Sequence, residues 1–219
     1  MAESDNQLAS SFTDLMTSLA VIFILLLCVT HNEAQQEGET TRDSILLELK
    51  NELKEFMQKG VKVEPDPKDP LALLILVPEG LMEFKFDRAE IPPAGKDFLR
   101  PFIPKLAKIV CDKRFKDDIN SIVVEGHTDS TGTDQHNWKL SQERSMSVVD
   151  ETLSILDQMK ENKDVRDDFV KFISASGRGS AELMKVNGEE NPEQSRRVVF
   201  KIRVRSLEQR LVKIISSVS

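Results

Sequence analysis

One hydrophobic segment, from Leu8 to Val29, constrains this chain more than any other feature. At about 1.5 Å of rise per residue, a helix over this segment spans roughly 33 Å, which is enough to cross a bilayer once. A cleaved signal peptide would begin with Lys or Arg and end at a small-residue cleavage site, and neither is present. We therefore predict an uncleaved transmembrane helix over residues 8–30, preceded by a leader of residues 1–7.

Asp14 lies one turn inside this segment, where a carboxylate is costly and by default marks a functional site. At helical spacing it is flanked by four hydroxyl side chains: Ser10, Ser11, Thr17 and Ser18. Such a polar stripe favours a helix interface or a water-filled path, where hydroxyls can bond the carboxylate or help to dehydrate an ion. The alternative is that Asp14 lies at headgroup depth and caps the helix N-terminus.

The rest of the composition is typical of a soluble fold attached to the membrane helix, with 39% hydrophobic and 31% charged residues. A net charge of -7 argues against binding to nucleic acid. The local basic cluster between Arg196 and Arg205 is interpreted as the solvated face of a strand. Cys28 and Cys111 cannot form a disulfide framework.

A linker is predicted over residues 31–70. Within it, four apolar residues recur at steps of three and four: Leu46, Leu49, Leu53 and Phe56. This spacing predicts a short amphipathic helix over residues 43–59. Because so short a helix is marginal alone, it either packs on the folded domain or pairs with a second copy of the chain. The proline-rich stretch 64–70 ends the helix and marks the domain boundary.

From residue 71 onwards, strand-like and helix-like patterns alternate. We expect a hairpin of strands 71–77 and 81–86, a helix over 96–111, a strand over 121–125, a helix over 134–159 and a last strand over 197–205. In the last strand apolar residues alternate with basic ones, as in a sheet with one buried face. The pattern predicts an α+β domain over residues 71–206, with helices packed on one mixed sheet. The remaining residues, 207–219, are expected to form a terminal helix that covers the sheet or a dimer contact.

The densest cluster of functional residue types, Gly126-His-Thr-Asp-Ser-Thr-Gly132, follows the strand that ends at Glu125. The next helix carries Asn137, Leu140, Ser141 and Arg144. In composition and spacing this pattern resembles the OmpA-like peptidoglycan-binding domain, over roughly Leu71 to Arg205. The chain also resembles this family at three later places in the sequence: Gly177-Arg-Gly179, Asn191 and Ser195-Arg-Arg197.

The chemistry of the loop fits a zwitterionic peptide end. Asp129 can bind an ammonium group, and the guanidinium fork of Arg144 can bind a carboxylate. In the family, the matching Asp and Arg hold the diaminopimelate of peptidoglycan, so the resemblance implies this role for Asp129 and Arg144, with Thr128 and Asn137 in support. From the residues alone, an alternative stays open: Asp129 caps the helix and Arg144 fastens the loop.

A metal or hydrolytic site in the same loop is disfavoured. His127, Asp129 and His136 lie close in sequence, but no H-E-x-x-H motif or Cys pair accompanies them. Ser130 has no nucleophile elbow and Cys111 has no base near it in sequence. We expect no enzyme activity, no cofactor and no metal site.

The membrane segment adds a second resemblance. Phe12-Thr-Asp-Leu-Met-Thr-Ser18 is similar to the Asp motif of MotB-like stator subunits, in which a wall-binding domain follows the membrane helix. The resemblance implies a homodimer in the bacterial inner membrane, with its N-terminus cytoplasmic and its C-terminal domain periplasmic. It also implies A-type (MotA- or ZorA-like) multi-span partners, about five around two copies of this chain, and an ion-translocating role for Asp14 in a proton-driven rotary motor.

Two branches of that family are compatible with the sequence, the flagellar stator MotB and ZorB of the Zorya anti-phage defence system. The short leader without basic residues favours ZorB. A third hypothesis is a non-conducting tether between membrane and cell wall, for which a membrane carboxylate would have no use. The choice between proton and sodium stays open.

Overall fold

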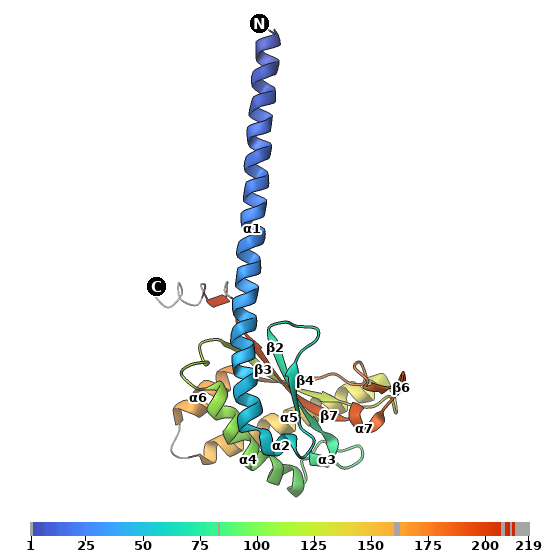
Figure 1. The fold of residues 1–219 in the computed structure, drawn as a ribbon. Helices are drawn as coiled ribbons and strands as arrows, with labels where there is room; N and C mark the ends of the chain where they lie inside the picture. Colours follow the sequence, from blue (N-terminus) through green and yellow to red (C-terminus); the bar gives the residue numbers. More distant parts are fainter. Residues whose placement is uncertain (1, 83, 160–162, 207–208, 211, 213–219) are drawn as a thin grey trace. The chain divides into compact units, whose positions relative to one another are not determined.

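The computed structural model describes the chain except residues 1, 83, 160–162, 207–208, 211 and 213–219 (Figure 1). The chain divides into two units, one of residues 1–38 with 206–219, and one of residues 39–205. Most of the predicted C-terminal segment, residues 207–219, lies outside the described residues.

The first unit is dominated by helix α1, which begins at Ala2 and continues to Glu52 (Figure 1). Its large apolar side chains between Phe12 and Val29 are exposed, for example Phe23 at 61%. Among the described residues, this is the one helix that is long and apolar enough to cross a membrane. An apolar surface of this size is unfavourable in water, so the helix requires lipid or other helices around it. The polar stretch 31–41, for which the sequence predicted no element, is also helical.

The second unit contains a five-stranded mixed sheet in the order β1-β2-β7-β3-β4. Its strands are β1 (Lys62–Pro65), β2 (Ala72–Pro78), β3 (Ile119–His127), β4 (Ile173–Gly177) and β7 (Arg197–Val204). The β3–β4 pair is parallel and the other pairs are antiparallel. A small second sheet pairs β5 (Lys185–Val186) with β6 (Glu189–Glu190).

The helices of this unit flank and connect the strands. They are α2 (Lys54–Met57), α3 (Glu79–Met82), α4 (Pro93–Val110), α5 (Asp134–Gln158), α6 (Lys163–Phe172) and α7 (Pro192–Ser195). The predicted α+β class, with helices packed on one mixed sheet, is confirmed. The predicted strand 121–125 and the helices 96–111 and 134–159 correspond to β3, α4 and α5.

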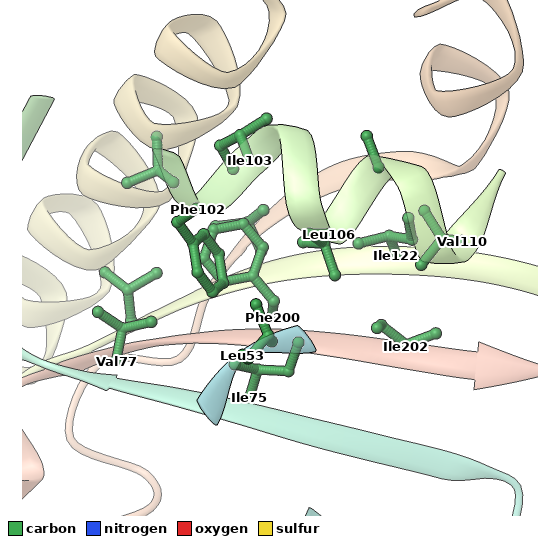
Figure 2. Packing of buried hydrophobic residues seen from close by; sticks show 14 of the residues in the cluster. Leu53, Ile75, Val77, Phe102, Ile103, Leu106, Val110, Ile122, Phe200 and Ile202 are labelled. Carbon is green, nitrogen blue, oxygen red and sulfur yellow. The ribbon is translucent and has the colours of Figure 1, made fainter. Parts of the chain in front are cut away.

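The hydrophobic core lies between one face of the sheet and the helices (Figure 2). In β7, Val198, Phe200, Ile202 and Val204 are buried in this core, as their alternation predicts. The ring of Phe200 lies 5.3 Å from that of Phe102 on α4. The opposite face of β7 carries Arg197, Lys201 and Arg203.

The amphipathic seam at residues 43–59 packs on its own domain. Leu49, Leu53 and Phe56 are almost completely buried in the same core, together with Ile45. Three ion pairs flank this contact: Glu48–Arg114, Glu52–Lys108 and Glu55–Lys105. The sequence left open whether the seam packs on its own domain or pairs with a second copy of the chain. In the structure it packs in the core of its own domain.

Two sequence interpretations are wrong. The expected hairpin partner, 81–86, is not a strand: residues 79–82 form α3, and β2 pairs with β1 and β7 instead. Met82 and Phe84 are buried, and a short apolar run of this kind cannot distinguish a strand from a buried loop. The basic cluster is also not simply solvated, because Lys201 and Arg203 form ion pairs with Asp66 and Asp69.

The buried seam leads to a stability prediction. We expect Leu49→Ala to lower the free energy of unfolding by about 2–5 kcal/mol, because it leaves a cavity in the core. The matched control is Leu47→Ala on the same helix, where the side chain is 64% exposed and the expected change is within about 0.5 kcal/mol. Denaturant unfolding of the full chain in detergent measures both, and equal losses would contradict the packing of the seam.

Candidate functional site

The candidate site is built on the turn from β3 to α5. Thr133 caps the helix, since its hydroxyl accepts a hydrogen bond from the His136 amide at 3.3 Å. Gly132 has a φ of +94°, a conformation that glycine adopts without strain. The Asp129 side chain accepts a hydrogen bond from the Thr131 amide at 3.0 Å and so shapes the loop before the helix. The helix cap is therefore Thr133 and not Asp129.

Two glycines let α5 lie directly against the sheet. A Cβ atom on Gly126 would lie 2.2 Å from the Ser141 carbonyl oxygen, and one on Gly177 would lie 2.6 Å from the Gln142 amide nitrogen. In addition, the Gly179 amide donates to the Ser141 hydroxyl at 2.9 Å. These contacts fix the distance between helix and sheet, and with it the place where residues of the helix meet residues of the loop.

Asp129, Arg144, Thr128 and Asn137, the four residues that the sequence associated with ligand binding, all line one cavity of about 660 Å³. Asn137 is buried and donates from its Nδ2 to the carbonyl oxygens of Asp129, at 3.3 Å, and Thr131, at 3.0 Å. Thr128 is also buried, and its Oγ1 has no hydrogen-bond partner among the described residues. The structure thus brings these four residues together.

The Asp129 carboxylate is held by a cation that the sequence analysis did not assign to the site. Its Oδ2 lies 2.7 Å from Nη1 of Arg196, whose Nε donates to Glu79. Burial by itself raises the pKa of Asp129, but the hydrogen bonds from Arg196 and from the Thr131 amide outweigh it, so the pKa lies below 3.8. Asp129 is therefore ionised at neutral pH.

The Arg144 guanidinium lines the same cavity and is largely buried. Its Nε donates to the Arg88 carbonyl at 3.0 Å, and its Nη1 lies 3.6 Å from Glu79. The guanidinium also lies 4.9 Å from the centre of the Phe84 ring. Burial lowers the pKa of Arg144, against the opposing effect of Glu79. The backbone contact shows that Arg144 does fasten the 85–88 loop, while its guanidinium also lines the cavity.

Glu79 and Arg196 complete an alternating chain of charges, Asp129–Arg196–Glu79–Arg144. The register of β2 with β7 places Pro78 opposite Arg197, and so brings Glu79 and Arg196 together at the ends of the two strands. The sequence carries no local signal for this pair, because the register joins segments more than a hundred residues apart. In the sequence, Arg196 stands out only as a family mark and as part of the basic cluster.

The three residues considered for zinc do not form a ligand set in the described part of the chain. His136 is half exposed at the cavity and pairs with Asp87 at 2.8 Å. His127 is buried, and its Nε2 lies 3.8 Å from a carboxylate oxygen of Glu125. Burial lowers the pKa of His127, while Glu125 opposes this shift.

Asp14 lies in the other unit, on the exposed surface of α1. Thr17 and Ser18 are exposed on the same helix, and the Thr17 hydroxyl donates to the Thr13 carbonyl. Ser10 and Ser11 lie in the helix, but their side chains fall outside the described part. The predicted polar face of Asp14 therefore stays a prediction.

Comparisons with known proteins agree with both resemblances. The sequence profile of the OmpA family matches residues 83–197. ZorB, a Zorya protein of Escherichia coli, is 26% identical over 229 residues, which cover 97% of this chain and 94% of ZorB. Outer membrane protein A of Bordetella avium is 32% identical over 92 residues, covering 41% and 43% of the two chains. A solved MotB-like protein from Desulfovibrio vulgaris shares the fold, with a TM-score of 0.54 at 18% identity, covering 78% of this chain and 96% of that one.

The lowered pKa of Asp129 predicts a dependence of stability on pH. A carboxyl group whose pKa is lower in the folded state stabilises the fold fully above its unfolded pKa and loses this effect as the pH falls through the folded value. We expect Asp129→Asn to lower the unfolding free energy by about 1 kcal/mol at pH 7. The difference from the native chain should begin to shrink near pH 3.8 and disappear as the pH falls through the lower pKa of the folded state.

Thermal denaturation of both chains between pH 7 and pH 2 measures this difference. The matched control is Asp97→Asn, which removes an exposed carboxylate paired with Arg100 on α4. A difference between Asp129→Asn and the native chain that persists unchanged at pH 2 would contradict the assignment.

Proposed function

The chain belongs to the OmpA family, and on this basis we propose that its folded unit binds peptidoglycan. The observation that carries the proposal is that Asp129 and Arg144, from two different elements, line one cavity together with their supporting residues. A cavity lined by both an ionised carboxylate and a guanidinium suits a zwitterionic ligand end, such as that of diaminopimelate in a stem peptide.

The charges already present suggest how such a ligand would enter. A ligand ammonium would compete with Arg196 for Asp129, whose Oδ1 stays bonded to the Thr131 amide. The ligand carboxylate would be bound by Nη1 of Arg144, which lies 3.6 Å from Glu79, and by the displaced Arg196. Each charge of the ligand thus replaces a charge of the same sign within the chain Asp129–Arg196–Glu79–Arg144, so few buried charges are left unpaired.

The proposed layout places this unit outside the inner membrane. Residues 1–7 form a cytoplasmic leader, 8–30 cross the membrane once and 207–219 form the C-terminal tail. The periplasmic linker is shorter than the predicted 31–70, because the seam helix and β1 belong to the folded unit of residues 39–205. The exposed apolar surface of α1 supports the single crossing. The orientation rests on the periplasmic location of the ligand, because charges around the helix do not specify it.

We further propose that the chain is the B-type subunit of a proton-driven rotary motor, specifically the ZorB component of a Zorya anti-phage system. The similarity to ZorB extends over nearly the whole chain and so includes the helix that carries Asp14. In this proposal two copies pair inside a ring of A-type subunits, about five in number, and Asp14 carries the proton with help from its hydroxyl neighbours. The chain itself catalyses no covalent reaction.

The mechanism follows from charge and anchorage. Protonation of Asp14 removes its charge and changes its contacts with the surrounding ring, which drives one step of rotation. One charge that crosses about 100 mV supplies roughly 2.3 kcal/mol. Binding of the wall through Asp129 and Arg144 would resist the reaction torque.

The membrane carboxylate can be tested by Asp14→Asn, which keeps the shape of the side chain and removes its titratable charge. We expect phage plating efficiency to rise to that of cells without the system, while the amount of chain in the membrane is unchanged. The matched control, Asp5→Asn in the leader, should retain full protection. Loss of swimming with intact phage protection would indicate a flagellar stator instead, and no change in either would indicate a non-conducting tether.

Wall binding can be tested by sedimentation of the full chain in detergent with purified peptidoglycan sacculi. Asp129→Asn and Arg144→Lys should each weaken binding at least about tenfold, because each removes a charge-assisted hydrogen-bonding group. The matched controls, Asp97→Asn and Arg100→Lys, alter an exposed ion pair on α4 and should bind as the native chain does. Undiminished binding by both site variants would contradict the proposed site.

A further inference from the structure

The face of the sheet opposite the core holds a second cluster of functional side chains. Ile122 and Val124 of β3 point into the core, so Glu125 and His127 lie at the other side, where strand alternation directs them. The segment after β4 covers this face and contributes Arg178 and Glu182. Together these segments line a cavity of about 630 Å³, whose lining residues all differ from those of the Asp129 cavity.

His127 is the unusual residue of this cavity. Its side chain is about 99% buried, and neither ring nitrogen has a hydrogen-bond partner among the described residues. A buried imidazole normally has a partner for at least one nitrogen, because an unsatisfied polar group in the interior is costly. The two unpaired nitrogens therefore indicate a bound group that the described protein atoms do not supply.

Two carboxylates lie next to this imidazole. One ligand atom each from Glu125, His127 and Glu182 lie within 4.8 Å of one another, and His127 Nε2 lies 3.8 Å from Glu125 Oε2. Lys68 and Arg178 both donate to Oε1 of Glu182, so neither of them bonds its Oε2. One oxygen of Glu182 is thus held in place by cations while the other is left for a further contact.

We propose that Glu125, His127 and Glu182 bind one divalent transition metal ion of the Zn²⁺ type. One imidazole nitrogen and two carboxylate oxygens form a ligand set that Zn²⁺ takes, with water in the remaining position, whereas Mg²⁺ and Ca²⁺ prefer oxygen alone. Glu125 and Glu182 supply two negative charges, and Glu182 is at the same time paired with Lys68 and Arg178. This differs from the absence of metal that the sequence suggested, because Glu182 lies far from His127 in sequence.

The ion would join the segment after β4 to the end of β3. It would also immobilise His127, two residues before Asp129, and so stiffen the loop that shapes the other cavity. The role is structural, and it stands apart from the proposed function, since the two cavities use different ligating residues.

The test uses the full chain in detergent, stripped with EDTA, dialysed and titrated with Zn²⁺ in the presence of millimolar Mg²⁺. We expect one Zn²⁺ per chain by elemental mass spectrometry and a rise in Tm on binding. His127→Gln and Glu125→Gln should each weaken Zn²⁺ binding about 100-fold or more, since loss of an outer-shell partner alone typically costs 10–100-fold.

Two matched controls distinguish this site from other acidic or histidine groups. His136→Gln removes the half-exposed imidazole beside Asp87, and Glu189→Gln removes an exposed carboxylate on β6. Both should bind Zn²⁺ as the native chain does. Glu125→Gln keeps the test valid if His127→Gln fails to fold. Less than one bound Zn²⁺ per native chain, or equal affinity in the native chain and Glu125→Gln, would overturn the proposal.

Discussion

The contact between the α5 backbone and strands β3 and β4 determines where the candidate site lies. Gly126 and Gly177 have no side chain to separate helix from sheet, and any Cβ at either position would collide with the helix backbone. The helix therefore lies at a short, fixed distance from the sheet, and Arg144 on α5 reaches the cavity that the β3–α5 loop shapes. Both the fold of the unit and the position of Asp129 relative to Arg144 depend on this contact.

In the candidate site, the charges of Asp129 and Arg144 are both paired with other charged side chains. Asp129 and Arg144 do not contact each other; Arg196 and Glu79 lie between them and neutralise both. Such an arrangement keeps buried charges paired before a ligand arrives, and it favours a ligand that carries both signs. A ligand with a single charge would displace one partner and leave the other without compensation. The selectivity we propose thus comes from the whole charge chain.

The sequence predicts those parts of the protein whose signal is local. The apolar run of α1, the alternation in β7 and the helical spacing in α5 each follow from neighbouring residues. The motif of the loop and the following helix identifies four residues that line the cavity, but not Glu79 or Arg196, which line it too. Three other features depend on contacts between distant segments: the presence of strand β1, the absence of the expected hairpin, and the pairing of Glu79 with Arg196. The His127 cluster depends on Glu182 in the same way. Patterns within a short window carry no information about such register, so these features required the structure.

The central claim is that one cavity recognises both charges of the diaminopimelate end of a stem peptide. Calorimetric titration of the full chain with two disaccharide-tetrapeptides tests it most directly, one with meso-diaminopimelate and one with lysine, which lacks the terminal carboxylate. The account predicts that the diaminopimelate form binds at least about tenfold more tightly, because Arg144 and Arg196 bind that carboxylate. Equal affinity for the two peptides would contradict it.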